Sequence, residues 1–230
     1  MADKIKDTEH KLTLRQLRLS DFKAVKSIMD TVYSNLGGSW TKKEFEALLN
    51  AFPEGQICIA DKGKIIAGAL SIIVKYADYG DKHTYDEIVG KGEFNTHNPD
   101  GDTLYGVDVF VNPDYRNLRL GRRLYDARKE MCENLNLRAI IAGGRIPGYQ
   151  EHSDQMSPKK YIEMVRNKEI YDPILTFQLS NDFHVRKILK GYMPSDKESK
   201  AYATLLEWIN VYYEPSEEII GNQIIRLNWL

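Results

Sequence analysis

Residues 104–135 contain the residue types and the spacing most suited to a binding or catalytic site. An apolar, strand-like run is followed by a short turn and then by a helix with strong apolar periodicity. Backbone N–H groups at a helix start lack partners, and the helix dipole is positive there. Four arginines add positive charge around this start: Arg116, Arg119, Arg122 and Arg123. The segment predicts a site for a pyrophosphate or a similar anion.

One other interpretation of this segment stays open. Charge and spacing alone fit an ordinary surface helix with solvated arginines equally well. The chain has neither GxxxxGK[ST] nor a GxGxxG followed about 20 residues later by an acidic residue, so neither familiar phosphate loop is present.

Asp108 is the second group of interest, because it is an acidic residue inside the apolar run before the turn. An ammonium with a pKa of about 10.4 must lose a proton before its nitrogen can attack a carbonyl. A carboxylate on the strand can accept that proton directly or through water. Asp108 is therefore a candidate general base. The alternative is that it only binds a substrate ammonium or anchors neighbouring backbone.

The sequence from Val111 to Gly121, VNPDYRNLRLG, resembles the phosphate-binding signature of GNAT-superfamily N-acetyltransferases. That signature is Gln/Arg-x-x-Gly-x-Gly/Ala after a strand ending Val-x-Pro-x-x-Arg. Arg116 and Gly121 match it, whereas Arg119 replaces the first glycine. We expect Arg119 to compensate by contacting phosphate through its side chain.

The resemblance implies acetyl-CoA as co-substrate and assigns positions around it. The pantetheine amides would pair with the backbone of Val109, Phe110 and Val111, which places the thioester near Asp108. The resemblance also implies a set of residues at the pyrophosphate: Arg116, Asn117, Leu118, Arg119, Leu120, Gly121 and Arg122. No metal is implied.

Residues 177–192 resemble the closing segment of the family, with Gly191-Tyr192 in place of Gly-Phe. This match predicts a strand, a cap and a final helix. Asn181 would lie at the helix start and contact the cofactor. Lys187 then occupies the place of the family's acid tyrosine, and His184 on the same helix is a substitute candidate.

Three longer stretches, including IAGGRIPGY and KESKAYATLLEWINVYYEP, resemble the acetyltransferase half of bacterial proteins that also carry a carbon-nitrogen hydrolase domain. The resemblance implies a fused or separate hydrolase as a partner. It leaves open whether the chain is a truncation of a longer protein and whether it forms a homodimer.

The expected fold is α/β, with a GNAT-like mixed, mostly antiparallel central sheet flanked by helices. We expect one acetyltransferase-like domain over 1–230, with a long loop at 76–103 and an insertion at 146–172. A strand is predicted at 11–17, a helix capped by Ser20 and ended by Gly37-Gly38, and a hairpin turning at 61–64. Thr41 and Glu44 form a capping-box pattern.

Composition excludes several classes of protein. Lys and Arg total 32 against 33 Asp and Glu, a formal charge of -1, so nothing indicates a basic nucleic-acid surface. Two distant cysteines suggest neither disulfides nor zinc. No apolar run could span a membrane, and the cytoplasm is the expected location. His83, His97 and His152 match no metal-ligand spacing, and we expect them to be solvated.

Together these observations predict an acetyl-CoA-dependent N-acetyltransferase that acts on a primary amine by direct transfer in a ternary complex. The acceptor could be a small molecule or a peptide, and acidic residues in loop 76–103 could attract it. The alternative is a catalytically weak acyl-CoA-binding sensor or regulatory module.

Overall fold

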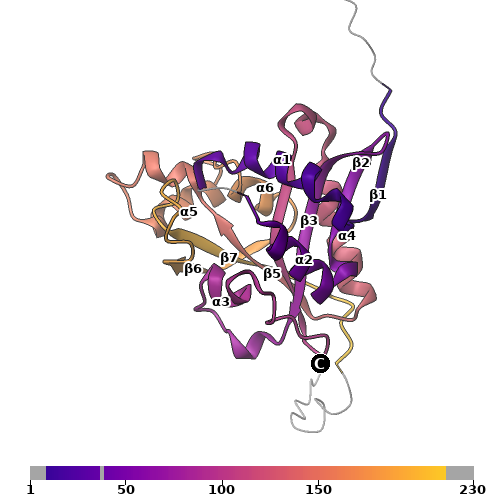
Figure 1. The fold of residues 1–230 in the computed structure, drawn as a ribbon. Helices are drawn as coiled ribbons and strands as arrows, with labels where there is room; N and C mark the ends of the chain where they lie inside the picture. The colour runs from indigo at the N-terminus through magenta and orange to yellow at the C-terminus, as the bar shows by residue number, and fades with distance from the viewer. Residues whose placement is uncertain (1–8, 37–38, 216–230) are drawn as a thin grey trace, which may run out of the picture.

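The computed structural model describes residues 9–36 and 39–215. Seven strands form one sheet in the order β1-β2-β3-β4-β5-β7-β6 (Figure 1). Only the β4–β5 pair is parallel, so the sheet is mixed and mostly antiparallel, as expected. The strands are β1 (Leu12–Gln16), β2 (Ile57–Asp61), β3 (Lys64–Val74), β4 (Thr103–Val111), β5 (Ala139–Arg145), β6 (His184–Lys190) and β7 (Tyr202–Ile209).

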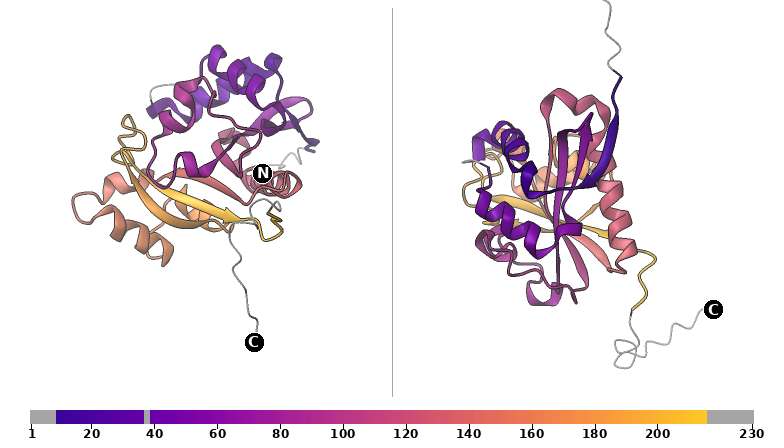
Figure 2. Two further views of the ribbon diagram at one scale, coloured as in Figure 1. Left: turned by 90° about the horizontal axis from the view of Figure 1, so that it is seen from below. Right: turned by 45° about the vertical axis from the view of Figure 1, so that its right-hand side comes forward.

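Helices cover both faces of the sheet, because each presents an apolar stripe that must be buried (Figure 2). On one face lie α1 (Phe22–Val32), α2 (Lys42–Ala51) and α3 (Tyr85–Ile88), whose apolar side chains join one core. On the other face lie α4 (Leu120–Asn134), α5 (Pro158–Arg166) and α6 (Leu175–Leu179).

The cap predicted at the start of α2 is confirmed, whereas the cap predicted for α1 is wrong. The Thr41 hydroxyl accepts from the Glu44 N–H, and the Glu44 carboxylate accepts from the Thr41 N–H, which closes the expected capping box. Ser20 is not the N-cap of α1, because it lies inside a short 3-10 helix and Asp21 occupies the cap. Gly37-Gly38 lies outside the described residues, and α1 already ends at Val32.

The order predicted for residues 177–192 is wrong. The segment around Phe177 forms α6, and the following segment forms β6, which pairs antiparallel with β7. Gly191, with φ 73°, therefore belongs to the turn between two strands and does not end a helix. The strand predicted after it is confirmed as β7.

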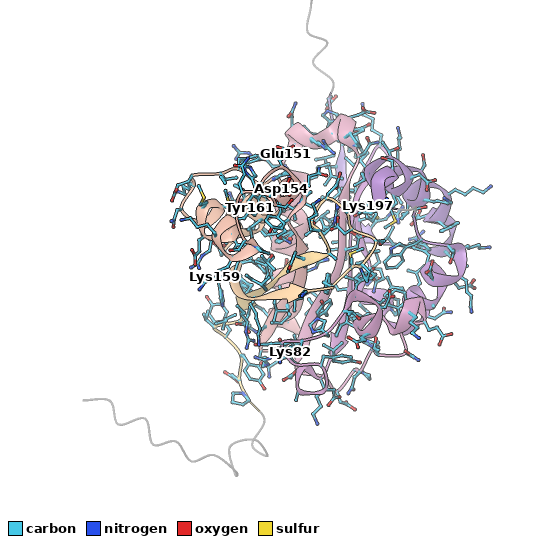
Figure 3. All side chains as sticks on the ribbon, turned by 90° about the vertical axis from the view of Figure 1, so that its left-hand side faces the viewer. Lys82, Glu151, Asp154, Lys159, Tyr161 and Lys197 are labelled. Atoms are coloured by element: carbon cyan, nitrogen blue, oxygen red, sulfur yellow. The ribbon has the colours of Figure 1, made fainter. Side chains whose placement is uncertain are left out.

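The loop and the insertion pack on opposite faces. Loop 76–103 carries α3 and short 3-10 helices, and buries Val89 and Phe94 in the core beneath α1 and α2. Insertion 146–172 forms α5, whose Tyr161 and Ile162 are buried on the α4 face. Figure 3 shows the insertion with Glu151, Asp154 and Lys159 labelled around Tyr161; these three charged residues are exposed.

Candidate functional site

The central feature of the site is a fork between β4 and β5. The two strands pair in parallel from Thr103↔Ala139 only as far as Gly106↔Ala142. Beyond this point β4 continues against β3, and β5 continues against β7. The sheet therefore opens between the later residues of the two strands, as the predicted insertion of a pantetheine arm would require.

The open edge of β4 has backbone groups to offer a ligand. The Asn112 N–H donates to the Ile66 carbonyl at 2.8 Å, and Phe110 lies opposite Gly68. In an antiparallel pair, alternate residues direct their N–H and C=O groups toward the partner strand. Val109 and Val111 therefore direct theirs toward the fork, where the Val109 carbonyl also accepts from the Tyr33 hydroxyl at 3.4 Å. This geometry suits the expected amide pairing, which itself stays a prediction.

A β-bulge places Asp108 at the fork. Leu70 lies opposite Asp108 while Ser71 lies opposite Gly106, so Val107 is the extra residue. A bulge interrupts the alternation of side chains between the two faces. Val107 packs into the core beneath α1, and the Asp108 carboxylate reaches the same side, where it accepts a hydrogen bond from Tyr33.

The surroundings of Asp108 raise its affinity for a proton. Burial raises the pKa of Asp108 to about 6, although the Tyr33 hydrogen bond, the Val109 backbone and the charges of Arg128 and Arg145 act in the opposite direction. At neutral pH the group is mainly ionised and still accepts a proton more readily than an ordinary aspartate. Such a carboxylate at a fork in the sheet suits a general base.

Arg128 is a site residue that the sequence analysis missed. It extends from α4 to the fork, where it donates to the carbonyls of Leu70 and Asp108 at 2.9 and 2.8 Å. Its spacing in the sequence could have indicated this position, because Arg128 follows Leu120 and Leu124 at intervals of four residues, on the buried stripe of the helix. A charged residue on such a stripe needs buried polar partners.

A series of buried hydrogen bonds lies behind the fork. It includes a histidine that we expected to be solvated, so that expectation is wrong. His83 and His97 are not solvated: His83 is buried, and His97 Nδ1 accepts from the Ile73 N–H at 3.1 Å. His83 Nδ1 faces the Gly80 carbonyl at 3.0 Å, and its Nε2 faces the Tyr105 hydroxyl at 2.9 Å. Tyr105 in turn pairs with the Tyr192 hydroxyl at 2.9 Å.

The chemistry of these groups determines which of them donates and which accepts in each hydrogen bond. A carbonyl can only accept, so neutral His83 holds its hydrogen on Nδ1, and Nε2 accepts from Tyr105. Tyr105 then accepts from Tyr192. Tyr192 packs on the β5 arm of the fork, because a Cβ added to Gly143 would lie 2.1 Å from the Tyr192 ring carbon Cζ. Tyr192 therefore lies beside the opening, against Gly143 and hydrogen-bonded to Tyr105.

The β5 arm also carries negative charge. Arg145 pairs with Asp196 at 2.7 Å and with Glu198 at 2.8 Å, so two carboxylates face one guanidinium. The acidic residues of loop 76–103 contribute less than expected, because several have other partners. Asp81 and Asp102 pair with arginines outside the loop, and Glu87 closes a capping box.

The α4 start has the geometry expected of an anion site. Arg119 occupies the N-cap with φ 53° and ψ 31°, a left-handed conformation that favours glycine, and no side chain caps the helix. Arg116, Asn117, Arg119 and Arg122 are exposed, whereas Leu118 is half-buried and Leu120 is buried, so these leucines can offer only backbone. Gly121 packs on Phe177, where an added Cβ would lie 2.9 Å from Cζ.

The residues assigned to a final helix lie elsewhere. Asn181 does not begin a helix; its side-chain amide is buried and donates to the Phe177 carbonyl at 2.7 Å, which closes the end of α6. His184 and Lys187 lie on β6 at the sheet edge, and His184 faces Glu207 at 3.2 Å. Because β7 separates β6 from β5, neither residue stands on an arm of the fork.

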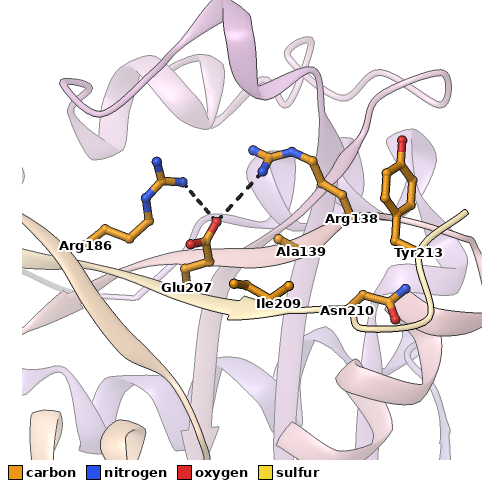
Figure 4. A pocket seen from close by; sticks show the side chains of 7 residues that line it. All are labelled: Arg138, Ala139, Arg186, Glu207, Ile209, Asn210 and Tyr213. Carbon is orange, nitrogen blue, oxygen red and sulfur yellow. Dashed lines mark hydrogen bonds and ion pairs between the residues drawn. The ribbon is translucent and has the colours of Figure 1, made fainter. Parts of the chain in front are cut away.

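Two surface hollows lie away from Asp108. One, of about 510 Å³, contains Glu207 between Arg138 and Arg186 (Figure 4), at 3.9 and 2.9 Å respectively. The other, of about 460 Å³, lies beside Thr41 and Lys91.

Within residues 9–36 and 39–215, no three His, Cys, Asp or Glu side chains gather as a metal would require. No helix in these same ranges is long and apolar enough to cross a membrane.

The sequence is similar to a known protein family and to two bacterial proteins. The sequence model of the acetyltransferase (GNAT) family matches residues 22–150. The chain is 38% identical to the probable hydrolase YhcX of Bacillus subtilis over 94% of its own length, but spans only 42% of YhcX. It is 33% identical to the uncharacterized N-acetyltransferase YkwB of the same bacterium, over 76% of this chain and 77% of YkwB.

Among solved structures, the GphF GNAT-like decarboxylase in complex with isobutyryl-CoA superposes with a TM-score of 0.75. The match covers 86% of this chain and 98% of GphF at 19% sequence identity. At that identity the likeness supports the fold alone.

Proposed function

Because the chain belongs to the acetyltransferase (GNAT) family and is therefore an acyltransferase, we propose that it transfers an acetyl group from acetyl-CoA to a primary amine within a ternary complex. The observation that carries the proposal is the position of Asp108. Its carboxylate, with a pKa raised to about 6, stands at the β4–β5 fork within reach of an arm of cofactor inserted there.

The cofactor would lie across the fork and the start of α4. The uncapped N–H groups from Arg119 to Arg122 and the exposed arginines hold the pyrophosphate. The backbone of Val109 and Val111 pairs with the pantetheine amides, and the thioester reaches Asp108. The choice of an acyl-CoA follows from the family, and GphF, whose fold this chain shares, is described in complex with isobutyryl-CoA.

The reaction needs one proton acceptor and one aligned thioester. Asp108 takes a proton from the substrate ammonium, and the freed amine attacks the carbonyl carbon, forming a C–N bond. The carbonyl electron pair moves onto oxygen and returns as the C–S bond breaks. The CoA thiolate leaves with its bonding pair and takes up the second proton, which the attacking nitrogen loses as the amide forms. Holding both reactants in place supplies the rest of the rate gain.

The charge around the fork favours a cationic acceptor. Asp108 on β4 and the two carboxylates paired with Arg145 on β5 outnumber the guanidinium groups of Arg145 and Arg128, so the opening carries net negative charge. An ammonium is attracted by such a field and is then deprotonated by the group that attracts it most closely. We propose a small-molecule or peptide amine as the acceptor.

The first prediction tests Asp108. In Asp108→Asn we expect turnover to fall by roughly 100- to 10,000-fold, as for the loss of a general base, while acetyl-CoA affinity stays unchanged. Release of free CoA on a panel of amines measures turnover, and calorimetry measures affinity. Asp126→Asn, on the exposed surface of α4, is the matched control.

Wild-type turnover in Asp108→Asn would exclude its role as base. Acetyl-CoA binding by the wild-type protein without turnover on any amine would instead support the sensor. Absence of binding would exclude both functions.

The similarity to YhcX suggests a hydrolase as a partner. YhcX is a probable hydrolase, and the chain matches less than half of it. We propose that the acetyltransferase unit acts together with a fused or separate carbon-nitrogen hydrolase.

A further inference from the structure

The fork holds a buried cation whose hydrogen-bonding capacity is only partly used. Arg128 is 3% exposed. Its Nε donates to Ser71 Oγ at 3.0 Å, and its Nη2 donates to the carbonyls of Leu70 and Asp108. These bonds occupy three of the five N–H donors of a guanidinium. Within the part of the chain that the structure describes, Nη1 has no hydrogen-bond partner.

Nη1 lies at the base of the fork. A Cβ built on Gly106 would lie 3.0 Å from Arg128 Nη1 and 3.4 Å from Ala142 Cβ. Gly106 and Ala142 form the last pair before β4 and β5 separate. The absence of a side chain at Gly106 therefore makes room for the guanidinium. Arg128 approaches the fork from the α4 face, and the Asp108 carboxylate lies on the α1 face.

The charge of Arg128 is also incompletely compensated. Among residues 9–36 and 39–215, no carboxylate lies within ion-pair distance of this guanidinium, although Asp108 contributes a favourable field. A buried cation without an anionic partner is costly to the fold. It becomes favourable when negative charge develops beside it, because its hydrogen-bonded orientation needs no rearrangement.

We propose that Nη1 of Arg128 donates to the carbonyl oxygen of the bound acyl thioester and stabilises the oxyanion formed during transfer. This inference rests on the proposed function and adds a second catalytic residue to it. The amine attacks from the Asp108 side, and the electron pair displaced onto oxygen is held by Nη1. When the C–S bond breaks, this pair reforms the C=O bond and the thiolate leaves.

A purely structural role for Arg128 predicts a different outcome. As a structural residue it would only join β3 and β4 at the bulge through its bonds to Ser71, Leu70 and Asp108. Three variants separate the two roles. Arg128→Met removes the donor, Arg128→Lys keeps the charge, and Gly106→Ala displaces Nη1 while leaving Arg128 in place. Glu130→Gln, exposed on the same helix, is the control.

The first measurement needs no acceptor. The carbonyl stretch of acetyl-CoA labelled with carbon-13 at the acetyl carbonyl is recorded by infrared difference spectroscopy. Binding to the wild type should move the stretch to lower frequency than in solution. The shift should disappear in Arg128→Met and shrink in Gly106→Ala. An equal shift in the wild type and both variants overturns the inference, and failure of the wild type to bind acetyl-CoA overturns the proposed function as well.

The second measurement separates kcat from binding. Loss of one oxyanion donor typically lowers kcat by roughly 100- to 1,000-fold. We expect such a fall in Arg128→Met and a smaller one in Arg128→Lys, with the affinity for free CoA, which lacks the acyl carbonyl, unchanged. Thermal unfolding reports the folding of each variant, and Gly106→Ala keeps the test valid if Arg128→Met does not fold. Unchanged kcat in folded Gly106→Ala and Arg128→Lys overturns the inference.

Discussion

At the scale of the residue, burial raises the proton affinity of Asp108 and Tyr33 lowers it. Its hydroxyl donates to the ionised carboxylate and so holds the pKa of Asp108 below the value that burial alone would produce. In Tyr33→Phe that pKa should rise by up to about one unit, since a hydrogen bond to a charged group contributes roughly 1.5 kcal/mol. The acidic limb of the kcat–pH profile should therefore move to higher pH.

The profile is measured from about pH 5 to pH 9. Turnover should fall more at about pH 6 than at about pH 8, where the base is ionised in both proteins. The matched control is Tyr171→Phe, a substitution at a side chain that is 73% exposed. An unmoved acidic limb in Tyr33→Phe contradicts this account of the site.

At the scale of the element, the turn before α4 combines backbone strain with a charge useful for binding. Arg119 adopts a left-handed conformation that costs a non-glycine residue about 1 kcal/mol or more. Arg119→Gly should therefore raise the unfolding temperature by about 2–4 °C. The same change should weaken acetyl-CoA binding several-fold, because a guanidinium beside the pyrophosphate is lost.

Differential scanning calorimetry measures the first effect and titration calorimetry the second. Arg119→Ala loses the charge but keeps the left-handed backbone, so it should lose affinity without gaining stability. The loss should shrink at high salt, since the turn is exposed. Wild-type affinity in Arg119→Gly would show that this arginine does not contact phosphate.

At the scale of the whole molecule, stability should fall as the pH drops from about 7 to 6. Burial lowers the pKa of His83 and of His97. Both histidines bind a proton more weakly in the folded chain, so the unfolded chain binds more protons around pH 6.5 and is favoured as the pH falls. Asp108 opposes this trend, because its raised pKa makes the folded state take up a proton first.

Urea unfolding at about pH 7.5 and pH 6 measures the difference. The two histidines should outweigh the single aspartate in this range, and the double variant His83→Gln with His97→Gln should reduce or reverse the loss. Stability that is level or higher at pH 6 in the wild-type protein contradicts the expectation.

Local patterns predicted those parts of the fold that depend on neighbours in the sequence. The Thr41–Glu44 capping box, the hairpin between β2 and β3 and the apolar stripe of α4 all formed as expected. Segment 184–190 did not. Val185 and Leu189 have helical spacing, and a bulge opposite β7 between Val185 and Lys187 breaks the alternation that would have indicated a strand.

For the candidate site, the sequence by itself determined the types of its groups: an acidic residue in an apolar strand and a basic turn ahead of a periodic helix. Only the tertiary structure decided which groups meet. The bulge at Val107 brings Asp108 to the α1 face, and the parting of β4 from β5 after Gly106 opens the fork that Arg128 reaches from α4. Strand pairing joins residues far apart in the chain, so a bulge or a fork depends on partners that no local pattern contains.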